Sequence, residues 1–190
     1  MKTTVISLGG SLIFPDSSGP DVQFLERFRK LVLEESGKGR RFIIICGGGH
    51  INRMYNTALK EITMPAEPDD ETLDLLGIKA TYMNAYFVRQ VFGEDAHREV
   101  MENPTENIET GKRIIIGCGW KPGCSSDKDA VLAAGTFKAD TVINLSNIDY
   151  AYTKDPRKHD NAEKIEETTW KEFRKIVGDG FPAFSLVIAL

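Results

Sequence analysis

Three short β-branched runs in this chain each end in a glycine-rich segment. The segments are Leu8–Ser11, Cys46–His50 and Gly117–Asp127. The β-branched runs before these segments predict buried strands. Glycine at a strand end lets backbone N–H groups approach an anion with no Cβ in the way, and a following helix adds partial positive charge. One such segment is more often a tight turn. Three at the same relative position predict a site for phosphate groups.

The runs alternate with helical patterns along the chain. We expect strands at 4–8, 41–46, 113–116 and 141–145, and helices at 21–36, 49–59, 71–92 and 127–137. The strand at 41–46 is apolar throughout, as in a parallel sheet covered on both faces. The alternation predicts the α/β class, as a three-layer α/β/α sandwich with a mostly parallel central sheet. Ligands of such sheets bind beyond the carboxyl ends of the strands, where the glycine segments fall.

Several helices show recognisable ends and apolar spacing. Asp21 is expected to cap the first helix and Gly37 to stop it. Its apolar positions are Val22, Leu25, Phe28, Leu31 and Val32, and those of the helix at 71–92 are Leu73, Leu76, Ala80, Met83 and Phe87. Residues 103–110 read as a surface connection. Residues 170–177 read as an amphipathic helix, and the apolar end at 181–190 is unusual unless it is buried.

Composition excludes some classes of function. The 190 residues fit one domain or slightly more, and 41% are hydrophobic, enough for a sizeable core. A net charge of −4 gives no general attraction to nucleic acid or to anionic membranes. No apolar stretch approaches the roughly 18 to 20 residues that span a bilayer, and the N-terminus runs straight into a strand pattern, so we expect a cytoplasmic protein. Cys46, Cys118 and Cys124 are expected to be reduced thiols.

The first two glycine segments carry groups suited to phosphate. Gly9 and Gly10 offer bare N–H groups and Ser11 a hydroxyl, but no Gly-Lys-Ser/Thr sequence follows as in a P-loop, and the dinucleotide fingerprint is also missing. Arg53 stands four positions after Gly49, so its guanidinium points back toward the loop, where it matches phosphate oxygens. A simple turn and a solvated arginine remain the alternatives.

The third segment allows two interpretations. Ser125, Ser126 and Asp127 precede a helix, where such side chains commonly form an N-cap. The same hydroxyls and carboxylate can also position a phosphate acceptor and organise cations. No Ser/His/Asp or Cys/His constellation is present and no residues are assigned as metal ligands. Phosphoryl transfer needs positioning and charge stabilisation more than a nucleophilic side chain.

Five motifs together resemble the amino acid kinase superfamily, and within it the uridylate kinases of the archaeal type. They occur in the family's order, as Ser-Leu-Gly-Gly-Ser at 7–11, Gly-Gly-Gly-His-Ile-Asn-Arg at 47–53, Asp-Leu-Leu-Gly-Ile-Lys-Ala-Thr-Tyr-Met-Asn-Ala at 74–85, Gly-Cys-Gly-Trp-Lys-Pro-Gly-Cys-Ser-Ser-Asp at 117–127 and Asn-Leu-Ser-Asn-Ile-Asp-Tyr-Ala-Tyr-Thr-Lys-Asp-Pro at 144–156. The resemblance covers about residues 3–177. It implies transfer of the γ-phosphoryl group of ATP to UMP with Mg²⁺, giving UDP and ADP without a covalent enzyme intermediate.

The resemblance also implies roles for single residues. Those expected at the reacting phosphoryl group are Gly9, Gly10, Ser11 and Asp127, the last orienting Lys or Mg²⁺ partners. Those expected to bind UMP are Gly48, Gly49 and Arg53 at its phosphate and Asp74 at its ribose or uracil. The segment 119–126, with Gly119, Ser125 and Ser126, is expected to close over the uridine and the phosphates. Those expected to bind ATP are Ser146, Asn147, Tyr152 and Asp155, with Tyr152 beside the adenine. A homo-oligomer, hexamer or dimer, is the implied assembly.

The chain departs from the family pattern at three places. Ser7 stands where most of the superfamily has a lysine that neutralises the transferring phosphoryl group, so another cation must substitute, and Lys128 is one candidate. The family's Asn-Val-Asp-Gly is replaced by residues 147–150, which end in Tyr150. The sequence after 177 does not match the family. We therefore expect one domain over residues 1–190, with an acceptor and oligomerisation lobe at about 1–120 and an incomplete ATP lobe at about 121–190.

Two other functions remain open. One is a catalytically impaired homologue that binds nucleotide and serves as a regulatory or assembly subunit, because Ser7 and the C-terminal sequence depart from the family. The other is a kinase of the same fold that acts on a small carboxylate or carbamate. Asp74 argues against the second, because an acidic side chain suits a sugar hydroxyl better than a carboxylate.

Overall fold

Four parallel strands form the central sheet of the computed structural model, which describes residues 1–147, 150–154, 159–169, 171–172 and 175. The strands are β1 (Thr3–Leu8), β2 (Arg41–Cys46), β3 (Ile114–Gly117) and β4 (Thr141–Leu145). Their order in the sheet is β3-β2-β1-β4, so the first strand lies between the second and the fourth. Each lies within one residue of its predicted bounds.

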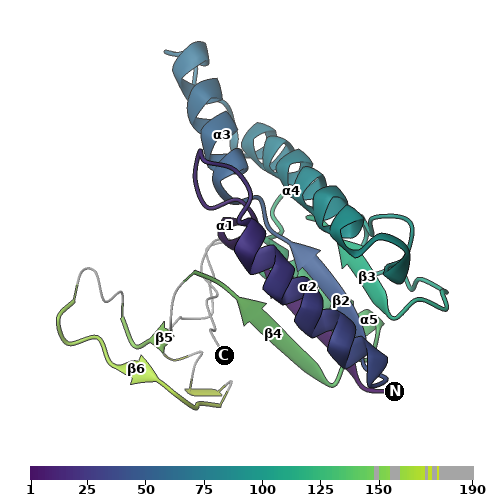
Figure 1. The fold of residues 1–190 in the computed structure, drawn as a ribbon. Coiled ribbons are helices and arrows are strands. Elements are labelled where there is room, and N and C mark those ends of the chain that lie inside the picture. Colours follow the sequence, from purple (N-terminus) through teal and green to yellow (C-terminus); the bar gives the residue numbers. More distant parts are fainter. Residues whose placement is uncertain (148–149, 155–158, 170, 173–174, 176–190) are drawn as a thin grey trace.

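Helices cover both faces of this sheet (Figure 1). The helices of the described residues are α1 (Gly10–Ile13), α2 (Val22–Gly37), α3 (Gly49–Thr63), α4 (Asp70–Phe92) and α5 (Ser126–Thr136), with the short 3-10 helix η1 (Gly93–Asp95) after α4. α2 and α4 pack on one face and α5 on the other. A separate antiparallel pair joins β5 (Ala151–Tyr152) to β6 (Lys164–Ile165). The predicted three-layer sandwich with a parallel sheet is confirmed.

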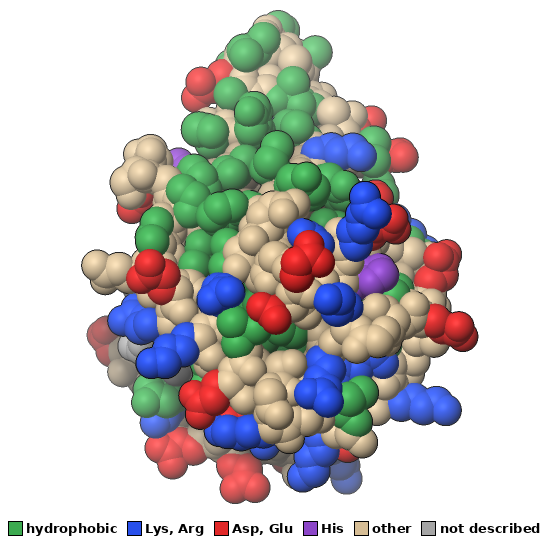
Figure 2. Space-filling view, turned by 45° about the vertical axis from the view of Figure 1, so that its right-hand side comes forward, with side chains coloured by type: hydrophobic (Ala, Val, Ile, Leu, Met, Phe, Trp, Pro, Cys, Tyr) green, Lys and Arg blue, Asp and Glu red, His purple; other side chains and the backbone are tan. Residues whose placement is uncertain are grey.

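One surface of the molecule is rich in exposed hydrophobic side chains. Figure 2 shows them gathered over the upper part of the molecule, where α3 and α4 lie. We call this surface the α3/α4 apolar face; its members are Met54, Tyr55, Ile62, Met64, Leu75, Tyr82, Met83, Tyr86 and Phe87.

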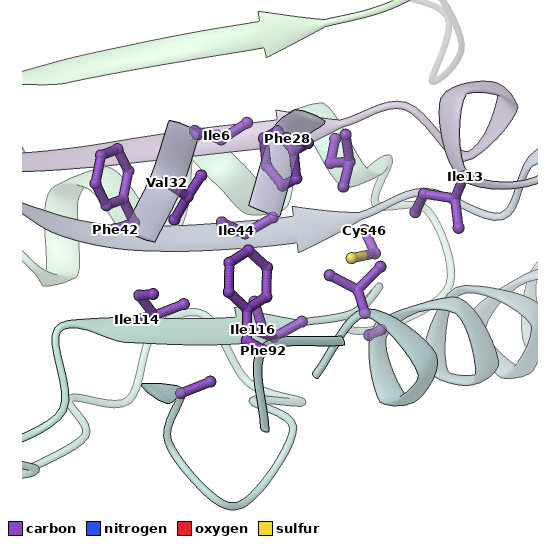
Figure 3. Close-up of a cluster of buried hydrophobic side chains, with 14 of the residues drawn as sticks. Ile6, Ile13, Phe28, Val32, Phe42, Ile44, Cys46, Phe92, Ile114 and Ile116 are labelled. Atoms are coloured by element: carbon purple, nitrogen blue, oxygen red, sulfur yellow. The ribbon is translucent and has the colours of Figure 1, made fainter. Parts of the chain in front are cut away.

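The core has two layers because successive strand residues point to opposite faces of the sheet. Ile6, Ile44 and Ile116 pack toward α2 and α4, where the rings of Phe28 and Phe92 meet edge to face with centroids 6.2 Å apart (Figure 3). The alternate residues of the same strands pack against α5, and they are Val5, Ile43, Ile45 and Ile115. Burial on both faces explains why these strands are apolar throughout.

The start of α2 agrees with the prediction, but its end and its buried face differ. Asp21 caps the helix as expected and accepts a hydrogen bond from the Phe24 N–H at 2.9 Å. The helix does not stop before Gly37 but includes it, and the residue with a positive φ is Gly39, at +93°. Val22 and Leu31 are 61% and 58% exposed. The sheet therefore buries a narrower stripe of this helix than its apolar spacing indicated.

The inward face of α4 was also predicted incorrectly in part. Met83 and Phe87 are 61% and 38% exposed, whereas Ala80, Asn84 and Val88 are buried. Hydrophobic periodicity failed here because this face of α4 packs against backbone loops as well as against the sheet. Small and polar side chains fit that contact better than large apolar ones.

The remaining expectations concern connections and thiols. Residues 103–110 form turns without a helix or strand, as predicted. Cys46, Cys118 and Cys124 are unpaired, and burial raises the pKa of the Cys118 thiol to about 12.

The apolar end at 181–190 and most of the helix expected at 170–177 lie outside the described residues. Among the residues that are described, no helix has the length and apolar character needed to cross a membrane.

Candidate functional site

The first two glycine loops lie backbone to backbone beyond the carboxyl ends of β1 and β2. A Cβ added to Gly10 would collide with the backbone N of Gly49, and one added to Gly49 would collide with the Gly10 carbonyl. A Cβ on Gly47 would lie 2.8 Å from the Gly10 nitrogen. Gly49 also has a φ of +61°, which disfavours any side chain. Glycine is therefore required at these positions by the contact between the loops.

Only some of the loop N–H groups remain available to a ligand. The Gly9 N–H donates to the Leu145 carbonyl at 2.8 Å, and the Gly47 N–H donates to the Leu8 carbonyl at 2.9 Å. The expectation that Gly9 offers a bare N–H is therefore wrong, because the fold uses this group to join the loop to β4. In the described part of the chain, four loop N–H groups have no acceptor, those of Gly10, Ser11, Gly48 and Gly49.

Arg53 joins the two loops. It lies one turn into α3, and its Nη1 donates to Ser11 Oγ at 3.3 Å. The spacing between Gly49 and Arg53 predicted that the guanidinium would point back toward the loops, and this is confirmed. The positive charge of Arg53 therefore lies at the first loop, next to Ser11.

Asp127 lies in the first turn of α5, against the neighbouring strands β1 and β4. Its Oδ1 accepts hydrogen bonds from Ser7 Oγ at 2.6 Å and from Asn144 Nδ2 at 3.1 Å. Ser7 and Asn144 are register partners across β1 and β4. Burial raises the pKa of the Asp127 carboxyl, while these two hydrogen bonds act in the opposite direction. The sequence drew attention to Ser7 only as a departure from the family and did not identify Asn144, although a polar residue within a predicted strand was a usable signal.

Three polar residues on one face of α4 hold the second and third loops. Asp74 Oδ2 accepts from the Gly123 N–H at 2.7 Å, and Thr81 Oγ1 accepts from the Gly119 N–H at 2.8 Å. The buried Asn84 donates through Nδ2 to the carbonyls of Gly47 and Gly48, at 2.8 and 3.1 Å. The motif at 74–85 thus serves, at least in part, to position loops.

The third loop is also tied to α5. Ser125 is the N-cap of α5 and accepts the Lys128 N–H at 3.2 Å, so the structural interpretation of this serine is confirmed. The fully buried Asp129 accepts the Trp120 N–H through Oδ2 at 3.1 Å, whereas its Oδ1 has no partner among the described residues. Burial raises the pKa of Asp129 to about 6.

A cavity of about 660 Å³ lies between α3, α4 and the third loop. It is lined by Asp127 and by residues expected to bind UMP, namely Gly48, Asp74, Gly119, Ser125 and Ser126. The lining also includes Gly123 and Cys124, which lie in the closing segment expected at 119–126. The sequence did not predict the other lining residues, which are Asn52, Asn56, Lys60, Asp70, Leu73, Gly77, Ile78 and Thr81. Three separate stretches of the chain, 48–60, 70–81 and 119–127, therefore meet at one cavity with both polar and apolar lining.

The residues expected to bind ATP are less closely grouped. Ser146 follows β4, and its Cα would lie 3.5 Å from a Cβ on Gly9, so this residue borders the first loop. Asn147 is exposed, and Tyr152 lies half-buried in β5. Within the described ranges, no hydrogen bond joins either of them to the glycine loops. Asp155 lies outside the described residues.

Comparison with known proteins gives consistent relationships. Residues 2–187 match the model of the Amino acid kinase family. A uridylate kinase of Methanospirillum hungatei JF-1 is 33% identical over 180 residues, covering 93% of this chain and 72% of that protein. One from Methanococcus maripaludis strain C5 is 30% identical over 176 residues, covering 92% and 76%.

Solved structures agree with the sequence relationships. The crystal structure of the uridylate kinase from Archaeoglobus fulgidus has a TM-score of 0.79 and 27% sequence identity, covering 97% of this chain and 82% of that one. The UMP kinase from Bacillus anthracis, at 18% identity and a TM-score of 0.70, shares the fold. With the interlocked glycine loops and the family match over most of its length, this chain belongs to the amino acid kinase family.

Proposed function

We propose that this protein is an ATP-dependent UMP kinase, which transfers the γ-phosphoryl group of ATP to UMP and forms UDP and ADP. The observation that carries the proposal is the cavity that brings Asp127 and Gly48 together with Asp74 and the third loop. Relatives at 30 to 33% identity are uridylate kinases, which favours UMP as the acceptor.

The acceptor phosphate lies at the junction of the first two loops in this proposal. The N–H groups of Gly48 and Gly49 and the guanidinium of Arg53 bind its oxygens, and the N–H groups of Gly10 and Ser11 face the transferred phosphoryl group. Backbone donors and a guanidinium stabilise charge that spreads over phosphoryl oxygens in the transition state. Gly9 acts indirectly, because its N–H anchors the loop to β4.

Arg53 also provides a positive charge that Ser7 does not. Ser7 donates to Asp127 instead of presenting a cation to the reaction. Lys128 is exposed, and no ion pair joins its ammonium to Asp127 within the described residues. Arg53 contacts Ser11 in the first loop, so we assign to it the neutralising role near the transferred group.

The proposed reaction also needs Mg²⁺. Mg²⁺ is commonly bound by one or two carboxylates together with substrate phosphates, and the half-buried carboxylate of Asp127 fits this pattern. The described residues contain no group of three or more metal-binding side chains. When bound, the ion would neutralise phosphate charge. Asp127 holds its orientation through Ser7 and Asn144.

The nucleotide donor is assigned to the opposite side of the first loop. Ser146, Asn147, Tyr152 and Asp155 are its proposed binding residues, and the position of Ser146 beside Gly9 supports this side. The division into an acceptor lobe at about 1–120 and an ATP lobe at about 121–190 belongs to the same proposal. The acceptor cavity draws residues from both sides of that boundary.

We also infer a homo-oligomer, dimer or hexamer, assembled through the α3/α4 apolar face. Monomeric proteins rarely leave an apolar patch of this kind uncovered. The face includes Ile62 and Met64, which are 81% and 71% exposed in the single chain (Figure 2).

An ADP-release assay with a panel of acceptors tests the function. UMP, CMP, N-acetylglutamate and carbamate would each be supplied with ATP and Mg²⁺, and turnover is expected with UMP above all. Binding of UMP without turnover of any acceptor would instead identify a catalytically impaired homologue. Preferred turnover of N-acetylglutamate or carbamate would identify a kinase for a small carboxylate or carbamate.

A further inference from the structure

Two asparagine side chains in the cavity have unused hydrogen-bonding groups. Asn52 and Asn56 lie one turn apart on α3, and both line the cavity. The Oδ1 atom of each is buried, and neither has a donor within the described part of the chain. Buried polar atoms in folded proteins are nearly always partnered. These two amides therefore indicate hydrogen bonds that a ligand completes.

The side chain of Asn52 lies in a space formed by two glycines. Its amide packs between Gly48 and Gly77, where an added Cβ would lie 2.8 Å from Asn52 Cβ and 3.2 Å from Asn52 Oδ1, respectively. The absence of side chains at both glycines leaves room for this amide beside the second loop. Asp74, one turn before Gly77 on α4, lines the same part of the cavity.

The order of these residues along α3 matches the order of groups in a nucleoside monophosphate. A helix rises about 1.5 Å per residue, so Asn52 lies about 4.5 Å and Asn56 about 10.5 Å along the axis from Gly49. With a phosphate held at Gly48 and Gly49, the sugar reaches Asn52 first and the base reaches Asn56 next.

The chemistry of an amide suits these two groups. The carbonyl and NH₂ ends of asparagine are alike in shape, so the side chain can turn either a donor or an acceptor to the cavity. Ribose hydroxyls both donate and accept, and the edge of a uracil ring alternates C=O and N–H groups. A small carboxylate or carbamate has no group that extends as far as Asn56.

We propose that Asn52 and Asn56 determine the specificity for the acceptor, with Asn52 binding the ribose hydroxyls beside Asp74 and Asn56 binding the edge of the pyrimidine base. This inference rests on the proposed UMP kinase function. It adds residues to the acceptor site that neither the glycine loops nor the motif at 74–85 contains.

The test replaces each amide by leucine, which has the same branched shape and no hydrogen-bonding group. In the full-length protein, Asn56→Leu should raise KM for UMP about five- to tenfold, as expected for a lost hydrogen bond, with kcat within about twofold. It should also reduce the preference for UMP over CMP. Asn52→Leu should reduce the preference for UMP over 2′-deoxy-UMP. Asn52→Ala and Asn56→Ala provide smaller replacements should a leucine variant fail to fold.

Thr57→Val is the matched control, because Thr57 is exposed on the same helix and does not line the cavity. It should leave KM and both preferences unchanged. Wild-type turnover of UMP with unchanged KM and preferences in all the asparagine variants would overturn this inference alone. Failure of the wild-type protein both to bind and to phosphorylate UMP would overturn it together with the proposed function.

Discussion

Asp127 is held in one orientation by a pair of residues that face each other on adjacent strands. Ser7 and Asn144 both donate to Oδ1, and in the described part of the chain Oδ2 has no donor. The carboxylate therefore has one oxygen fixed by the sheet and one oxygen for a ligand. This arrangement differs from an ordinary N-cap, and Ser125 performs the capping of α5 instead.

Asp127→Asn should lower kcat about a hundredfold or more, because an amide cannot supply the negative charge that orients cations at the phosphates. Its carbonyl can still accept from Ser7 and Asn144, so the melting temperature should change by only a few degrees. Steady-state kinetics and thermal unfolding of the same preparation check this. A loss of stability in step with activity would mean that Asp127 acts structurally.

Asp129 should make stability depend on pH. Its pKa in the folded protein, about 6, lies above the ordinary value of 3.8 because of burial, so protonation favours the folded state. This contribution is fully present below about pH 4 and is lost as the pH rises through about 6. Relative to Asp129→Asn, the wild type should therefore lose about 1 kcal/mol of unfolding free energy between pH 5 and 7.5.

Denaturant unfolding of both proteins at the two pH values measures this difference. The amide that replaces the Asp129 carboxyl in this variant retains an acceptor for the Trp120 N–H, so the comparison isolates the buried charge. The same wild-type-minus-variant difference at pH 5 and at pH 7.5 would exclude a raised pKa at Asp129.

Among the elements, α4 connects the site to the core. Asp74, Thr81 and Asn84 recur at helical spacing on one face and hold loops, while Val88 and Phe92 continue into the core beneath the sheet. The position of the loops is thus set by a long helix that is itself anchored by packing. The second and third loops, which both border the acceptor cavity, therefore depend on α4.

Asn84→Ala should disturb the second loop. The substitution removes hydrogen bonds to the carbonyls of Gly47 and Gly48 in a buried position, so the free energy of unfolding should fall by about 1–3 kcal/mol. KM for UMP should rise, because Gly48 and Gly49 carry the proposed phosphate donors. Denaturant unfolding and kinetics test both effects, with Lys79→Ala as control, because Lys79 is exposed on the same helix and belongs neither to the cavity lining nor to the α3/α4 apolar face. An unchanged KM would separate Asn84 from acceptor binding.

The bounds of the strands and helices were largely predictable from the sequence. The residues that each helix buries were less predictable. Apolar runs predicted β2 and β3 to within a residue, because both faces of the sheet are buried there. β1 and β4 were predicted as closely, although both contain polar residues and β4 is only partly buried. The exposed Met83 and the buried Asn84 were not predictable by periodicity, which assumes that the partner of a helix is apolar.

The site was predictable only where the residues of one segment determine its geometry. The spacing from Gly49 to Arg53 fixed the direction of the guanidinium, since both belong to the same helix. Asn52 and Asn56 resemble ordinary polar residues on a helix, and only the position of α4 shows that they border a cavity. The Gly10–Gly49 contact likewise depends on two loops that are distant in sequence.

At the scale of the whole molecule, the cavity and the α3/α4 apolar face are built from the same two helices. α3 and α4 place polar residues toward the third loop and hydrophobic ones outward. Assembly through the outer face would restrict movement of the helices that line the cavity. Oligomeric state and acceptor binding should therefore be linked.

Met83→Lys should weaken the oligomer by placing a charge in its proposed interface. The matched control is Leu31→Lys, because Leu31 is similarly exposed but lies on α2, away from the α3/α4 apolar face. Light scattering after size-exclusion chromatography should show a smaller species for Met83→Lys and the wild-type mass for Leu31→Lys. A monomeric wild type, or equal masses for all three proteins, would contradict assembly through this face.

The contact between Gly10 and Gly49 bears on how descendants of this protein can change. A methyl group at either position would collide with the opposite loop whether or not a nucleotide is bound. A lineage that lost the reaction but kept the sheet would still have to retain both glycines. Selection on Arg53 and Asp127, in contrast, would relax once catalysis was lost. In such a lineage, Arg53 and Asp127 would be replaced by other residues, whereas Gly10 and Gly49 would remain because the fold still requires them.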